Sequence, residues 1–108
     1  MTINIAKQFS KYPGGRFLED GDFSGQGFRE ELLVPALREY AQVTVELDGT
    51  LGYGSSFLEE AFGGLIREEG FYYEDLKDRL RLVAKSDMLP YTIDRYMQEA
   101  RPSPMPVG

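Results

Sequence analysis

The chain has 108 residues, the length of one compact domain, and 42% of them are hydrophobic, which is enough to build a core. Its net charge is −6, and this acidity argues against broad nucleic-acid binding, which needs a basic face. Cys and His are both absent, so disulfides, thiolate nucleophiles, histidine general bases and the usual zinc sites are excluded.

The sequence shows no membrane or targeting segment. No apolar run approaches the roughly 20 residues that a membrane span needs, and the N-terminus lacks the basic-then-apolar order of a signal peptide. We therefore expect a cytoplasmic location, which the lack of cysteine also favours. Neither a cofactor nor a metal is expected.

Two strands and a helix are predicted in the N-terminal part of the chain. Alternating isoleucines predict a short strand over Thr2–Ala6. The segment Arg16–Glu19 is predicted as a second strand, closed by an Asp-Gly hairpin turn. Ser24 can cap a helix that reaches about Ala41, and Pro35 should kink this helix or begin a new first turn.

The middle of the chain has the clearest pattern. Hydrophobic and polar residues alternate over Gln42–Leu47, which predicts a buried strand. A glycine-rich loop follows, and an apolar stripe then predicts a helix over Ser56–Glu69, which Gly70 should end. Gly63 and Gly64 lie inside this helix at a cost of about 1 kcal/mol each relative to alanine, so we expect another backbone to pack closely there.

The C-terminal part continues the alternation of helices and strands. A short helix over Tyr73–Arg79 and a strand over Leu80–Ala84 are predicted, followed by a last helix that has Pro90 early in it and reaches about Ala100. The aromatic trio Phe71–Tyr73 is more typical of core and rim than of a base-stacking platform. Residues 101–108 hold three prolines and should form an extended, mobile tail.

This order of elements predicts an α/β fold in which helices cover a small mixed β-sheet. Residues 1–100 would form this domain, and residues 101–108 would be the flexible proline-rich tail. The strands at 42–47 and 80–84 should pair in parallel, because a right-handed crossover through a helix joins them.

The turn between the central strand and the helix after it is the candidate site. Glycines let the backbone bend sharply there, and the serine pair begins the helix, where free N–H groups and the helix dipole favour negative charge. Ser56 either forms a capping box with Glu59, or one serine is a phosphorylation site or an anion contact. The candidate binding residues are Asp48, Thr50, Tyr53, Ser55 and Ser56.

Two segments carry a family resemblance. One is RFLEDGDFSGQGFREELLVPAL at residues 16–37, and the other runs over residues 43–70 and contains SSFLEEAFGGL after the glycine turn. Both are similar to a small bacterial STAS-like family of unknown function, DUF4325. The resemblance implies a STAS-like fold and a distant similarity to anti-sigma-factor antagonists.

In the anti-sigma-factor antagonists, a kinase-like anti-sigma partner phosphorylates a serine at the start of the helix after a buried strand. The partner then no longer binds the phosphorylated protein. The resemblance places that serine at Ser56, or at Ser55. Those relatives usually have Asp immediately before the serine pair, whereas Gly54 stands there in this chain and the nearest preceding acid is Asp48. A histidine-kinase-like ATPase or an anti-sigma-type protein is the implied partner.

The predicted function is a non-enzymatic regulatory module that binds another protein and is switched by serine phosphorylation. The alternative is a small nucleotide-binding or anion-binding protein, or an enzyme, that uses the Asp48–Ser56 turn. A homodimer formed through an open sheet edge is a third option. No nucleic-acid or membrane partner is expected.

Overall fold

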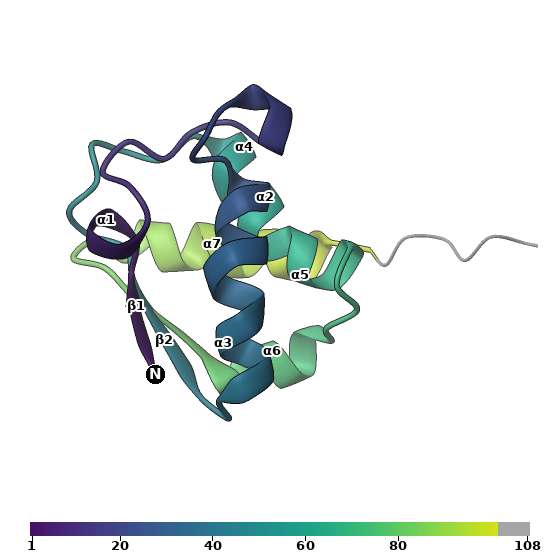
Figure 1. Ribbon diagram of the computed structural model, residues 1–108. Coiled ribbons are helices and arrows are strands. Elements are labelled where there is room, and N and C mark those ends of the chain that lie inside the picture. Colours follow the sequence, from purple (N-terminus) through teal and green to yellow (C-terminus); the bar gives the residue numbers. More distant parts are fainter. Residues whose placement is uncertain (102–108) are drawn as a thin grey trace, which may run out of the picture.

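Three short parallel strands form the sheet of this protein, seen here in a computed structural model that describes residues 1–101 (Figure 1). The strands are β1 (Thr2–Asn4), β2 (Val43–Glu46) and β3 (Leu80–Val83), in the order β1-β2-β3. Ile3 lies beside Val45, and Val45 lies beside Leu82, which sets the register. The predicted α/β class and the predicted parallel pairing of β2 with β3 are confirmed.

The sheet differs from the mixed sheet that the sequence predicts, because both of its strand pairs are parallel. The predicted strand at Arg16–Glu19 is wrong; a 3₁₀ turn, η1 (Leu18–Asp20), occupies part of it. The Asp20 carboxylate accepts hydrogen bonds from the backbone N–H groups of Arg16 and Phe17, at 3.2 and 2.8 Å. These bonds satisfy the backbone locally, so the segment turns on itself and forms no hairpin.

The first strand is shorter than predicted. It ends at Asn4, whose side chain accepts a hydrogen bond from the Lys7 N–H at 3.0 Å and so caps a short helix, α1 (Ile5–Gln8). Ile5, expected within the strand, is therefore helical, but it remains fully buried. The alternation of isoleucines correctly marked the buried positions but overextended the strand.

The first long helix runs without a break through α2 (Gly25–Phe28), the π-turn η2 (Arg29–Leu33) and α3 (Val34–Glu39). The Ser24 hydroxyl caps it by accepting the Gly27 N–H at 3.1 Å. The π-turn ends at Val34, whose N–H donates to the Arg29 carbonyl, immediately before Pro35. The disturbance predicted at this proline is thus confirmed, because proline has no N–H to continue the regular ladder.

The second long helix also contains a π-turn. It comprises α4 (Ser55–Leu58), η3 (Glu59–Gly63) and α5 (Gly64–Arg67). Gly70 has a φ of +81°, and the Phe71 N–H after it donates to the Leu65 carbonyl at 3.0 Å. The predicted stop at this glycine is confirmed, since the left-handed conformation lets the chain leave the helix.

Two further helices complete the fold, namely α6 (Tyr73–Arg79), whose predicted bounds are confirmed, and α7 (Met88–Glu99). In Figure 1, α7 passes behind the first long helix, and it packs along η3. Among residues 1–101, no helix combines the length and the apolar character that crossing a membrane would require. Residues 102–108, most of the predicted tail, lie outside the described residues.

The core lies between the sheet and the long helices. One face of the sheet is buried, because Val43, Val45 and Leu47 point inward from β2 and the residue that follows it. Phenylalanine rings fill the space above this face, with Phe28 and Phe57 fully buried and their ring centroids 6.1 Å apart.

Candidate functional site

The predicted serine turn lies at the carboxyl edge of the sheet, between the end of β2 and the start of α4. The Asp48 carboxylate accepts the Lys85 N–H at 2.9 Å, which ties the turn to the loop after β3. The Leu51 N–H donates to the Lys11 carbonyl at 2.9 Å, which ties it to the loop after α1. Segments that follow all three strands therefore meet here, at the edge where open parallel sheets commonly hold their ligands.

Glycine shapes this turn as the sequence predicts. Gly49 and Gly52 have φ angles of +102° and +138°, in the region that side chains with a Cβ rarely enter. A Cβ on Gly49 would also come within 3.0 Å of the Ala6 Cβ. The sharp bend and the close approach to α1 both require glycine.

Tyr53 anchors the turn to the core. Its hydroxyl donates to the Leu47 carbonyl at 2.6 Å, and its ring lies 5.8 Å from the ring of Phe57. Burial raises the pKa of Tyr53 above its usual value, because the charged form would lose its hydration. Thr50 accepts the Gly52 N–H at 3.4 Å. The turn is thus held internally by Tyr53, Thr50 and Asp48.

Ser55 and Ser56 are both exposed, and their hydroxyls have no hydrogen-bond partner among residues 1–101. Gly54 stands at the N-cap position, and the Leu58 N–H donates to its carbonyl at 3.2 Å as the first bond of the helix. The N–H groups that precede this bond are those that a helix leaves without an internal acceptor. The structure thus presents two hydroxyls beside the positive end of a helix.

The predicted capping box between Ser56 and Glu59 is wrong. Ser56 lies inside the first turn of α4, and no side chain caps the helix start. The Glu59 carboxylate instead receives hydrogen bonds from Arg67 at 2.7 and 3.1 Å, and from Arg16 at 2.5 Å. Charged partners hold a carboxylate more strongly than a neutral backbone N–H does, so Glu59 turns away from the serines.

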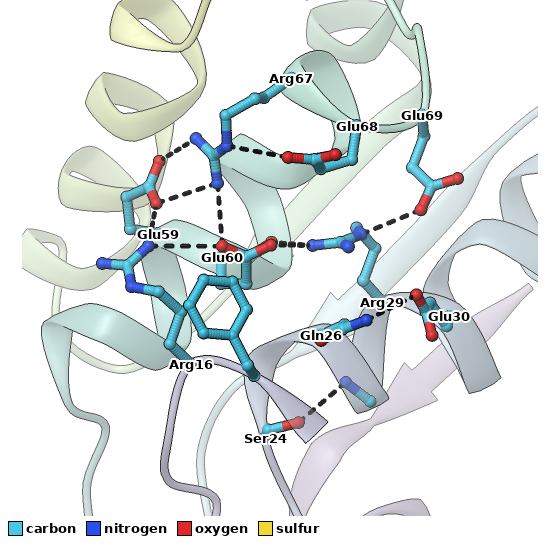
Figure 2. A network of polar contacts seen from close by, with 12 residues as sticks. Arg16, Ser24, Gln26, Arg29, Glu30, Glu59, Glu60, Arg67, Glu68 and Glu69 are labelled. Atoms are coloured by element: carbon cyan, nitrogen blue, oxygen red, sulfur yellow. Dashed lines mark hydrogen bonds and ion pairs between the residues drawn. The ribbon is translucent and has the colours of Figure 1, made fainter. Parts of the chain in front are cut away.

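Sequence reasoning missed a charged cluster that joins the two long helices (Figure 2). Arg29 and Glu60 are each only 3% exposed. The Arg29 Nη1 donates to the Glu60 carboxylate at 2.7 Å and to the Glu60 carbonyl at 2.6 Å, while its Nε donates to Glu69 at 3.0 Å. We call this set the clamp; its members are Arg16, Arg29, Glu59, Glu60, Arg67 and Glu69.

Three glycines make room for the clamp and for the helix crossing. A Cβ on Gly64 would collide with the Arg29 guanidinium, and a Cβ on Gly63 would come within 2.5 Å of the Glu59 carboxylate. On the facing helix, a Cβ on Gly25 would collide with the Phe57 carbonyl. We predicted that another backbone packs closely at Gly63 and Gly64, but the nearest neighbours are side chains, the Glu59 carboxylate at Gly63 and the Arg29 guanidinium at Gly64. The glycine pair was the sequence signal that could have located the clamp.

Ionisation in the clamp follows from its hydrogen bonds. Burial opposes the charge on Glu59, but the hydrogen bonds from Arg67 and Arg16 outweigh it, and the pKa of Glu59 lies below its usual value. The hydrogen bond to Glu59 likewise raises the pKa of Arg67. A depression of about 320 Å³ lies beside the clamp, but no buried side-chain polar atom of residues 1–101 lacks a hydrogen-bond partner. The clamp is therefore a satisfied structural element.

Within residues 1–101, no group of three or more Asp, Glu, His or Cys side chains is placed to hold a metal ion. The candidate site therefore consists of the serine turn, with the clamp behind its helix as support.

The model of the STAS-like domain of unknown function (DUF4325) matches residues 24–89, from the cap of the first long helix to the start of α7. This match covers more than half of the chain, so the chain belongs to that family. Searches of curated proteins and of solved structures found no match.

Proposed function

We propose that this STAS-like domain acts by binding rather than by catalysis, as a regulatory module whose docking surface is the Gly49–Ser56 turn with the exposed side of the following helix. Phosphorylation of Ser55 or Ser56 switches that surface. The observation that carries the proposal is the pair of exposed, unbonded serine hydroxyls at the start of a long helix.

The helix start can accept a phosphate without disturbing the fold. A phosphoserine brings about −1.5 to −2 charges at neutral pH, which free helix N–H groups favour. Glu59 and Glu60 lie only one turn further along, but Arg16, Arg29 and Arg67 pair with them. The new charge would therefore alter the surface that a partner meets rather than the packing beneath it.

An apolar surface adjoins the serine turn and can take part in docking. Leu51 is 80% exposed and Met88 is 68% exposed, at the tip of the turn and the start of α7. A shallow groove of about 330 Å³ runs between these two segments. It is lined by Gly52, Tyr53, Ser86, Met88, Leu89 and Thr92. Exposed apolar side chains beside a hollow are a common feature of protein-binding surfaces.

The implied partner is a histidine-kinase-like ATPase or an anti-sigma-type protein of the same cell. The proposal is tested by measuring its affinity for the wild-type chain, for Ser55→Ala/Ser56→Ala and for Ser55→Asp/Ser56→Asp. We expect the alanine variant to bind but to gain no phosphoryl group on incubation with ATP, as followed by intact mass. The aspartate variant should bind at least about tenfold more weakly, a difference of about 1.4 kcal/mol.

A matched control places the same charge elsewhere. Ala41 is exposed and precedes β2, so it lies at the opposite edge of the sheet from the serines. Ala41→Asp should leave the affinity unchanged. Equal affinities for the wild-type chain and for the aspartate variant at positions 55 and 56 would reject the surface that we propose.

The alternative, a nucleotide or anion site at the same turn, predicts a different result. Isothermal titration with phosphate and with nucleotides, with and without magnesium, would show binding that Ser56→Ala weakens. The side chains of Asp48 and Tyr53 are already engaged with Lys85 and Leu47 in this structure, which favours the protein-binding role. Light scattering tests the homodimer option directly.

A further inference from the structure

The serine turn leaves two features of the sequence unexplained, the aromatic trio and the proline-rich end of the chain. A groove of about 410 Å³ lies between the α5–α6 connection and the last turn of α7, which run side by side in Figure 1. Its apolar lining comes from Ile66, Phe71, Tyr72, Tyr73, Met97 and Ala100. Arg101, the last described residue, stands at its edge.

One ring of the groove, that of Tyr73, is held in place by hydrogen bonds. Gly70, with its positive φ, turns the chain so that the trio crosses the end of α7. The Tyr73 hydroxyl donates to Asp94 at 2.9 Å and accepts from the Gln98 amide at 3.2 Å. Tyr72 is 73% exposed, and its hydroxyl has no hydrogen-bond partner among residues 1–101. The groove thus offers apolar faces, one of them fixed at Tyr73, and one free donor at Tyr72.

This chemistry suits a proline-rich strand. Extended proline-rich segments dock in grooves lined by aromatic rings, and their stiffness keeps the entropy cost of docking low. Such segments also have more carbonyl acceptors than N–H donors, because proline has no N–H. The free Tyr72 hydroxyl can donate to one of those carbonyls.

We propose that this groove binds the chain's own C-terminal segment, residues 102–108. That segment, PSPMPVG, begins at the residue after Arg101 and contains three prolines and one methionine. In the polyproline conformation, seven residues span about 22 Å, which is long enough for the segment to lie across the groove. It carries no charged side chain, which matches the apolar lining. This assignment is independent of the function proposed for the serine turn.

Backbone order in the C-terminal segment of the full chain tests the assignment. Nitrogen-15 relaxation would be measured at the amides of Ser103, Met105 and Val107. If the segment docks, its order parameters should be about 0.85, the value of a rigid backbone. They should not change on tenfold dilution of the protein. Tyr72→Ala should lower them below about 0.6, because it removes the ring and the donor together.

Tyr91→Ala is the matched control, because Tyr91 is also an exposed tyrosine, at 59%, but lies outside this groove. This variant should keep the segment ordered. Pro104→Gly removes a proline from the segment and leaves the lining of the groove unchanged, so it should lower the order parameters of the segment. Order parameters below about 0.6 in the wild-type chain would overturn the proposal. Order that appears only at high concentration would also overturn it, since that would assign the groove to a second copy.

Discussion

At the scale of single residues, the buried pair Arg29 and Glu60 is the unusual feature of this protein. Charged side chains are seldom fully buried unless they are paired, and the pairing here is close to complete, with Arg29 bonded to two carboxylates and one carbonyl. Glycine at position 64 provides the space that the guanidinium occupies. One missing Cβ thus allows a buried ion pair to replace ordinary apolar packing.

Glu59 should make the stability of the protein depend on pH. Its pKa is lower in the folded chain than the ordinary value of 4.5, so its contribution is complete above that value and is lost as the pH falls below it. Glu59→Gln cannot titrate, so its free energy of unfolding should decline less than that of the wild type between about pH 6 and about pH 3. Urea unfolding at several pH values measures the difference.

Glu99→Gln provides the control for this experiment. Glu99 also pairs with an arginine, Arg95 at 2.7 Å, but its side chain is 61% exposed, so the pair is screened by water. This variant should follow the pH profile of the wild type. If the free energy of unfolding of Glu59→Gln has the same pH profile as that of the wild type, the hydrogen bonds in the clamp do not favour the charged form of the Glu59 carboxylate.

At the scale of elements, each of the two long helices contains a π-turn at the point where it contributes to the clamp. Arg29 begins η2, and Glu59 and Glu60 begin η3. A π-turn adds one residue to a helical turn and so shifts the faces that follow it. The clamp and the close contacts at the glycines both lie where the two long helices cross. The ion pairs of the clamp and the close approach of the two helix backbones therefore depend on each other.

A double-mutant cycle across the crossing should reveal this dependence. Arg29→Met leaves Glu60 and Glu69 without their buried partner and should lower the free energy of unfolding by about 3–5 kcal/mol. Glu60→Met leaves the Arg29 charge poorly compensated and should have a similar effect. The double variant should lose less than the sum, because neither charge is then left alone. Urea denaturation measures all four chains, and strictly additive losses would contradict the coupling.

At the scale of the whole molecule, the sheet joins segments that are far apart in the chain. Ile3 in β1 lies beside Val45 in β2, and β3 comes from residues 80–83. Each of these pairings must close a long loop before any contact is gained, so non-local contacts of this kind slow folding. The edge strand at the very start of the chain is therefore part of the core rather than a dispensable end.

Ile3→Ala tests this role of the N-terminal strand. The side chain is fully buried, so its truncation should lower the free energy of unfolding by about 2–5 kcal/mol, although residues near a terminus usually tolerate change. Leu51→Ala is the control, because Leu51 is 80% exposed and its truncation should change stability by less than about 0.5 kcal/mol. Thermal or urea unfolding of both variants provides the comparison, and equal effects would contradict the placement of β1.

Much of the fold follows from local patterns in the sequence. Alternation over 42–47, the apolar stripe after the serine pair, the new helical turn at Pro35 and the stop at Gly70 are effects of neighbouring residues on one another, and the structure confirms them. The same reasoning failed at Arg16–Glu19, where the Asp20 side chain bonds to the backbone and replaces the expected strand. Local alternation could not reveal that competition.

The sequence alone determined the order of elements from the first long helix onward, the α/β class and the glycine turn that leads to Ser55 and Ser56, because these depend on contacts within a few residues. Only the tertiary structure decided which partners bind the charged side chains of the helix that those serines begin. Arg16 and Arg67 draw Glu59 away from the expected cap, and Arg29 pairs with Glu60 across the helix crossing. Arg16 lies 43 residues from Glu59, and Arg29 lies 31 residues from Glu60. Partners this far apart are chosen by packing, which a local pattern does not encode.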